Sequence, residues 1–107
     1  MRPDDTQSYP VARKFVDTFG APRAPHEPIT DQHRDLAFAL QAVTEEVVLH
    51  MVRALLRAHP QRDLCLAGGV ALNCVANAKI LEHTDVRRVW VPPCASDTGA
   101  PLGSALW

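Results

Sequence analysis

Two adjacent glycines, Gly68 and Gly69, are the first residues in the chain whose type and spacing could do chemistry. A glycine pair lets the backbone adopt positive φ angles and lets an anion approach without meeting a Cβ atom. The pair directly precedes a predicted helix, whose first N–H groups are unpaired and favour negative charge. The pattern predicts either a phosphate-binding turn or a tight structural turn. Neither a P-loop nor a G-x-G-x-x-G motif is present to decide between them.

A second candidate is Asp97, in the segment Ser96-Asp97-Thr98-Gly99 ahead of another predicted helix. An aspartate at this position can cap the helix by accepting hydrogen bonds from N–H groups two or three residues on. It can equally present a hard oxygen ligand to a metal ion or a metal–nucleotide complex. The residues alone leave both roles open.

Two asparagines, Asn73 and Asn77, stand one helical turn apart after the glycine pair and share a helix face. Their amides could hydrogen-bond a nucleotide beside the glycine turn, or they could be solvated helix residues. The sequence does not separate these alternatives.

The elements that must position these residues alternate between helix and strand. Apolar periodicity and turn residues predict helix, strand, helix, strand and helix over residues 31–58, 63–67, 70–81, 86–91 and 100–107. Thr30 or Asp31 can cap the first helix, and Pro60 ends it. This order is typical of part of a layered α/β domain. Both candidate loops follow strands, and ligands of α/β sheets bind beyond the carboxyl ends of strands.

The first predicted helix is apolar over about half of its circumference. Its main stripe comprises Leu36, Leu40, Val43, Val47, Met51 and Leu55, widened by Val48, Val52 and Leu56. At ~1.5 Å per residue the helix is about 40 Å long, more than a small domain covers well. We therefore expect missing neighbours, and marginal stability or self-association of the chain by itself.

Prolines divide the amino-terminal segment from the rest. Residues 1–29 hold five of the nine prolines, which predicts an irregular lead-in with only residues 11–20 free for a short helix. Residues 30–107 are then the second, incomplete domain.

Composition excludes several classes of protein. The chain has 107 residues, a net charge of -1 and 47% hydrophobic residues, which fits one small globular domain and argues against a nucleic-acid binder. No apolar run approaches the ~20 residues of a membrane span. The amino terminus lacks the apolar core of a secretory signal, so we expect a cytoplasmic location.

The cysteines and histidines predict no metal site. The three cysteines lack C-x-x-C spacing and are expected as reduced thiols, with Cys65 and Cys74 in the core and Cys94 as the candidate reactive thiol in a loop. The five histidines form neither an H-x-x-x-H nor an H-E-x-x-H pair.

Five segments form a recognisable set: LCLAGGVALNCVAN at 64–77, VWVPP at 89–93 and DTGAPLGSAL at 97–106, with FGAPR at 19–23 and DLAFALQ at 35–41 upstream. Together they closely resemble the carbamoyltransferases of nodulation-factor and antibiotic tailoring. They stand in the family's order and cover roughly residues 15–107.

The resemblance implies a fold and a set of ligands. The fold would be part of a lobe of an ATPase like those of actin, sugar kinases and heat-shock proteins. The complete enzyme would use ATP and carbamoyl phosphate, form a carbamoyl-adenylate, and pass the carbamoyl group to a hydroxyl of a small-molecule acceptor. By position, Gly68 and Gly69 would line the nucleotide phosphates, Asn73 would contact the nucleoside, and Asp97 would bind a divalent metal, iron or magnesium. No catalytic residue is assignable.

The chain also departs from the family pattern. It lacks the H-x-x-x-H pair that completes the family's metal site, the amino-terminal phosphate loop and the carboxy-terminal domain. Pro101 stands where the family has other residues. We therefore expect one lobe of a two-lobe enzyme that is inactive alone, and the alternative is a non-catalytic remnant or nucleotide-binding module. A tRNA threonylcarbamoyltransferase fragment is less favoured, because that family has D-N-G where this chain has Asp97-Thr98-Gly99.

Overall fold

The computed structural model describes residues 13–107, in two compact units that divide after Asp31. The described part of the first unit holds α1 (Arg13–Phe19). Gly20 follows with a φ of 94°, and its N–H donates to the Val16 carbonyl at 2.9 Å, the usual glycine end of a helix. The lead-in predicted as irregular thus includes a helix in the stretch that prolines leave uninterrupted. The domain boundary predicted after residue 29 stays a prediction.

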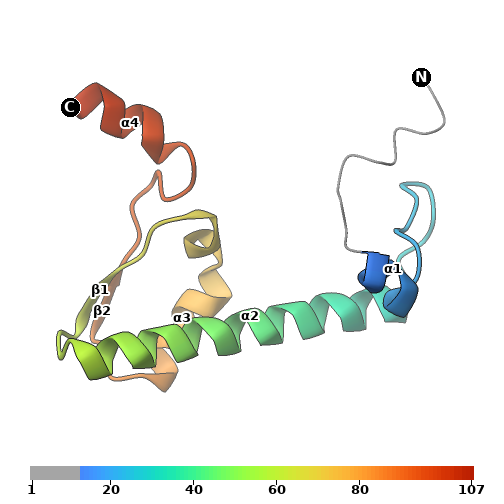
Figure 1. The fold of residues 1–107 in the computed structure, drawn as a ribbon, viewed down its shortest axis with the longest axis horizontal. Coiled ribbons are helices and arrows are strands. Elements are labelled where there is room, and N and C mark those ends of the chain that lie inside the picture. Colours follow the sequence, from blue (N-terminus) through green and yellow to red (C-terminus); the bar gives the residue numbers. More distant parts are fainter. Residues whose placement is uncertain (1–12) are drawn as a thin grey trace. The chain divides into compact units, whose positions relative to one another are not determined.

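The longest described helix is α2 (Asp31–Ala58), with 28 residues and the bounds that the hydrophobic period predicts. Its last turn closes where the His59 N–H donates to the Leu55 carbonyl at 2.8 Å, and Pro60 follows. Figure 1 shows α3 lying alongside its middle. The prediction for this helix is confirmed.

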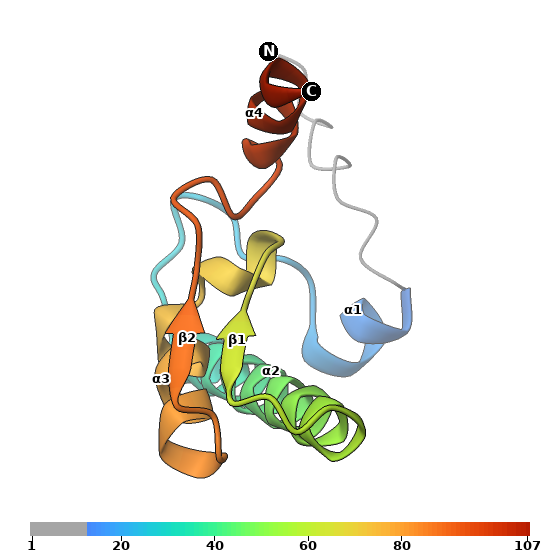
Figure 2. The ribbon, with the colours of Figure 1, turned by 90° about the vertical axis from the view of Figure 1, so that its left-hand side faces the viewer.

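A small parallel sheet stands beside the helices. Strand β1 (Asp63–Cys65) pairs with β2 (Arg88–Trp90), and the 3₁₀ helix η2 (Gly69–Leu72) and α3 (Cys74–His83) connect them. Figure 2 shows the two strands side by side. Both strands are shorter than predicted. The fold is mixed α/β and mostly helical, while the ATPase-like arrangement expected from the resemblance stays a prediction.

One face of the sheet carries the core. Leu64 and Val89 are register partners, and both pack against a cluster of Val52 from α2, Ile80 from α3, and Val86. Because side chains alternate along a strand, the residues on either side of Leu64 and Val89 point to the opposite face. That face lies outside the hydrophobic core.

The helix predicted over residues 70–81 is broken into two, so the prediction of one continuous helix is wrong. Asn73 has a non-helical backbone (φ -76°, ψ 90°), and its side chain accepts a hydrogen bond from the Ala76 N–H at 3.1 Å. The residue therefore ends η2 and caps α3. An asparagine placed on a predicted helix face is in fact the boundary between two helices.

The core positions predicted for two cysteines are wrong. Cys65 and Cys74 are exposed, and Cys94 is partly buried. The reason for Cys65 is the one-sided sheet, in which Leu64 takes the inward position and its neighbour faces out.

The last helix is α4 (Gly99–Leu106), one residue out of register with the predicted range of 100–107. Pro101 lies in its first turn, as expected. All residues from Pro101 to Trp107 are exposed. Among the described residues no helix combines the length and the apolar character that crossing a membrane requires.

Candidate functional site

The two predicted loops meet at the carboxyl edge of the sheet. The Gly68 N–H, after β1, donates to the carbonyl of Ala95, after β2, at 2.6 Å. The Leu66 N–H donates to the Trp90 carbonyl at 2.9 Å and extends the pairing toward the same edge. Because the strands are parallel, both loops leave the sheet at its carboxyl end. The structure thus brings the glycine turn and the Asp97 loop together.

The two glycines of the turn differ in what the fold requires of them. Gly68 has φ 95° and ψ 167°, a conformation open essentially to glycine alone. Gly69 has no positive φ, and a Cβ built on it would meet no atom within 4 Å. The fold therefore requires a glycine at the first position only, and open space lies beside the second.

The turn also leaves backbone donors unused. The Gly68 carbonyl accepts the Ala71 N–H at 3.1 Å, and the Gly68 N–H is bonded to the Ala95 carbonyl. The N–H groups of Gly69 and Val70 have no partner among the described residues. Two adjacent N–H groups beside open space can hold an anionic oxygen.

The Asp97 carboxylate is exposed and has no bonding partner among the described residues. The N-cap of α4 is Thr98, no side chain caps this helix, and the Asp97 side chain bonds to none of the described residues. The capping role that the sequence left open is therefore not taken. Gly99 is tightly placed, because a Cβ there would lie 2.7 Å from the Cys94 carbonyl oxygen. This close approach fixes the loop that presents Asp97.

Both asparagines are hydrogen-bonded inside the chain. Besides capping α3, the Asn73 amide pairs with Gln41 of α2, donating from Nδ2 to Gln41 Oε1 at 2.9 Å and accepting from Gln41 Nε2 at 3.3 Å. Asn77 donates to the Ala71 carbonyl at 2.7 Å and ties α3 back to η2. They are not simply solvated, and the nucleoside contact of Asn73 stays a prediction.

The polar network behind Asn73 was not predicted from the sequence. Gln41 Nε2 donates to Glu45 Oε1 at 2.8 Å, and Lys79 Nζ of α3 lies 3.0 Å from Glu45 Oε2. The hydrogen bond from Gln41, and then that from Lys79, lower the pKa of Glu45 below its usual range. The i, i+4 spacing of Gln41 and Glu45 was a visible signal. Their link to Asn73, 32 residues away, was not.

The described residues supply at most part of a metal site. Across residues 13–107 no group of three or more histidine, cysteine, aspartate or glutamate side chains could hold a metal ion. Asp97 fits as one oxygen ligand of a hard divalent ion, but a single carboxylate does not make a binding site.

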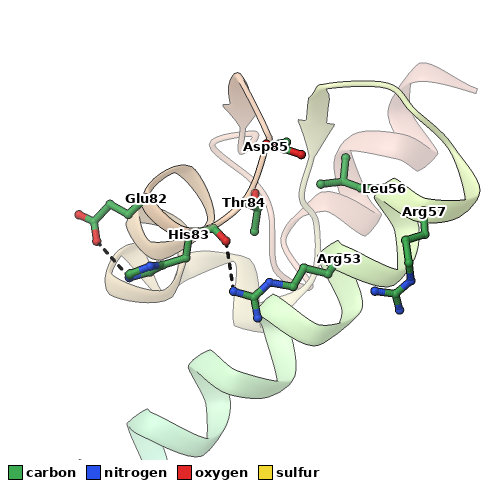
Figure 3. A pocket seen from close by; sticks show the side chains of 7 residues that line it. All are labelled: Arg53, Leu56, Arg57, Glu82, His83, Thr84 and Asp85. Atoms are coloured by element: carbon green, nitrogen blue, oxygen red, sulfur yellow. Dashed lines mark hydrogen bonds and ion pairs between the residues drawn. The ribbon is translucent and has the colours of Figure 1, made fainter.

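Hollows also lie away from the Asp97 loop, and two of them border α2. Figure 3 shows the first, where Arg53 of α2 donates to the His83 carbonyl at 3.1 Å and so caps the end of α3. The second is an apolar cavity of about 430 Å³ between α2 and the segment around the glycine turn, and its lining includes Val47, Met51, Ala67 and Val70. None of the predicted site residues lines the first hollow.

Comparison with known proteins identifies the family. The model of the carbamoyltransferase N-terminus matches residues 6–106. The chain is 45% identical over 95 residues to the uncharacterized protein sll1178 of Synechocystis, covering 88% of this chain and 15% of that protein. It is 44% identical over 79 residues to nodulation protein NolO of Bradyrhizobium diazoefficiens, covering 74% of this chain and 14% of NolO.

A third relative, nodulation protein NolNO of Sinorhizobium fredii, is 42% identical over 79 residues, which are 74% of this chain and 12% of NolNO. The chain thus spans less than a sixth of the length of these relatives. No solved structure matches it. Since the family model covers almost the whole sequence, the chain belongs to the carbamoyltransferase N-terminus family.

Proposed function

We propose that this chain is part of an ATP-dependent O-carbamoyltransferase. The complete enzyme would convert carbamoyl phosphate, ATP and water to a carbamoyl-adenylate, phosphate and pyrophosphate, and would then transfer the carbamoyl group to an acceptor hydroxyl with release of AMP. Family membership supports the transferase class. The observation that carries the site is the hydrogen bond from Gly68 to Ala95, which joins the two loops at one edge of the sheet.

Each loop contributes a different group to the nucleotide. The N–H groups of Gly69 and Val70, which have no partner among the described residues, would donate to phosphate oxygens of ATP in the open space beside Gly69. The Asp97 carboxylate contributes one ligand to a divalent metal, iron or magnesium, and residues outside this chain complete its shell. Asn73 contacts the nucleoside.

Transfer requires more than this chain. The described residues include no group of metal ligands, and the chain covers only 12% to 15% of its relatives. Carbamoyl phosphate and the acceptor would bind to the rest of the enzyme. Micromolar binding of ATP by the isolated chain would instead favour a nucleotide-binding module.

The test replaces the matching segment of NolO with this chain and measures carbamoyl-phosphate-dependent exchange of pyrophosphate into ATP. This exchange reports adenylate formation and needs no acceptor. We expect the chimera to catalyse it, and Asp97→Asn to reduce the rate about 100-fold or more, because loss of even an outer-shell partner of a metal ligand costs about 10–100-fold. The control is Asp85→Asn, which changes an exposed aspartate ahead of β2 that pairs with Arg62.

An active chimera whose exchange rate is the same with Asp97→Asn as with Asp85→Asn would exclude the metal role of Asp97. Failure of the chimera to exchange pyrophosphate, when unmodified NolO does so, would contradict the proposed function.

A further inference from the structure

The amide of Asn73 has a fixed direction, because its oxygen is held by a group that can only donate. Oδ1 accepts the backbone N–H of Ala76 at 3.1 Å and Gln41 Nε2 at 3.3 Å. A flipped amide would place its NH₂ group against the Ala76 N–H, with two donors facing each other. The helix cap therefore determines which end of the amide faces Gln41.

Gln41 is oriented independently from its other side. Its Nε2 donates to Glu45 Oε1 at 2.8 Å, and a flipped Gln41 would turn its oxygen toward a carboxylate that only accepts. Lys79 holds the second oxygen of Glu45 at 3.0 Å, and the Glu45 side chain is only 12% exposed. The acceptor side of the network is thus anchored by a charged pair.

These two anchors leave Asn73 with one free group. Its oxygen has two donors, and one proton of Nδ2 goes to Gln41 Oε1 at 2.9 Å. The second Nδ2 proton has no partner among the described residues, and Asn73 is partly exposed. The side chain therefore offers an outside ligand one donor and no acceptor.

We propose that Gln41 and Glu45 are positioning residues that fix Asn73 as a single hydrogen-bond donor to an acceptor oxygen of the nucleotide. This proposal rests on the proposed function, because it takes the ligand of Asn73 to be ATP. It deepens that function by giving the contact a direction. The group that meets Asn73 is a ribose oxygen acting as acceptor, and not a hydrogen-bond donor of the nucleoside.

The orientation is tested on the full 107-residue chain without ligand. Hydrogen exchange of the two Asn73 side-chain protons is followed by NMR in the parent, Glu45→Gln and Gln41→Leu, with the exposed neighbour Glu46→Gln as control. The inward proton is the Nδ2 proton that bonds Gln41 Oε1. We expect it to exchange about threefold to tenfold faster in Glu45→Gln and in Gln41→Leu than in the parent, the factor that one hydrogen bond provides. The Ala76 N–H stays protected in Glu45→Gln, because Asn73 Oδ1 is unchanged. Equal exchange of the inward proton in all four proteins overturns the proposal.

The role toward ligand is tested by ATP titration of the NolO chimera. Asn73→Asp keeps an oxygen to cap α3 but removes the donor, so we expect about tenfold weaker binding, as for a lost hydrogen bond to a charged or polar oxygen. Glu45→Gln should weaken ATP binding by a smaller factor, and Glu46→Gln should not. Loss of affinity in Gly69→Ala but not in Asn73→Asp or Glu45→Gln overturns the positioning role alone. No loss in any of these variants contradicts the proposed nucleotide site as well.

Discussion

The two sides of α2 are both apolar, yet only one of them is covered. Val52 and its neighbour Val48 face the sheet and α3, and Val52 is part of the buried cluster with Ile80. The main stripe is less covered, because Val47 and Met51 in it line the apolar cavity beside the glycine turn and Met51 is 64% exposed. The hydrophobic period locates a helix and its apolar arc, but only the neighbours decide which part of the arc is buried.

The glycine turn shows the same contrast at the scale of two residues. The fold uses Gly68 for its positive φ and for the hydrogen bond to Ala95, whereas Gly69 has no positive φ and a Cβ built on it would meet no atom within 4 Å. A substitution of Gly68, which the fold requires, should therefore lower stability. A substitution of Gly69, which the fold does not require, should instead lower the affinity for ATP.

The largest expected difference in unfolding free energy lies between the buried position Ile80 and the exposed position Met51. Ile80→Ala should lower the free energy of unfolding by about 3 kcal/mol, because Ile80 is fully buried and truncation leaves a cavity. Met51→Ala should change it by less than about 0.5 kcal/mol. Urea unfolding followed by circular dichroism measures both. If Ile80→Ala does not fold, Ile80→Val gives a measurable loss of about 1 kcal/mol. Equal effects at the two positions would show that α2 packs differently.

The next contrast separates the two glycines. Gly68→Ala should cost about 1–3 kcal/mol, because its φ of 95° is unfavourable for any residue with a Cβ. Gly69→Ala should be nearly neutral in the isolated chain, where a Cβ meets nothing. Thermal unfolding of the two variants beside the parent measures this difference. A larger loss in Gly69→Ala would contradict the geometry of the turn.

Lowering the pH should weaken the contacts that Glu45 makes with Gln41 and Lys79. Glu45 has a lowered pKa and faces Gln41, Lys79 and His83, so its stabilising effect is complete above the ordinary glutamate pKa of about 4.3. The effect is lost as the pH falls through the lowered value of the folded state. The melting temperature should therefore fall more steeply with acid in the parent than in Glu45→Gln. Asp63, whose pKa is lowered by Arg88, contributes equally to both curves. Parallel curves for the two proteins would exclude the predicted role of Glu45.

A substitution in the main stripe of α2 should have the smallest effect on stability. It should nevertheless change self-association clearly. Met51→Glu places a charge on an exposed apolar surface that we expect to drive self-association. Sedimentation velocity should show a shift toward monomer with little change in unfolding. A parent chain that is already monomeric at all concentrations would contradict the expectation of self-association.

Strong local signals were sufficient for the main elements. The capping residues Thr30 and Asp31 and the stop at Pro60 located both ends of α2, and short apolar runs located both strands. The break at Asn73 was missed because a capping side chain overrides a continuous helical pattern. The exposure of Cys65 was missed because composition does not tell which face of a strand is covered.

The candidate site was predicted in its parts but not in its connections. The sequence located the two loops, whereas their hydrogen bond joins Gly68 to Ala95 across the sheet. The pairing of Gln41 with Asn73 depends on how α2 packs against α3, and no local pattern encodes it. Long-range polar contacts are therefore where the structure adds most.

The central claim is that the open space beside Gly69 receives the phosphates of ATP. It is tested most directly by calorimetric titration of the NolO chimera with ATP and Mg²⁺, comparing Gly69→Ala with Gly103→Ala, whose Cβ also meets no atom within 4 Å. We predict that Gly69→Ala weakens ATP binding by about tenfold or more, equivalent to about 1.4 kcal/mol, at an unchanged melting temperature. Gly103→Ala should bind ATP like the parent. Equal ATP affinity in the parent and in both variants would contradict the claim.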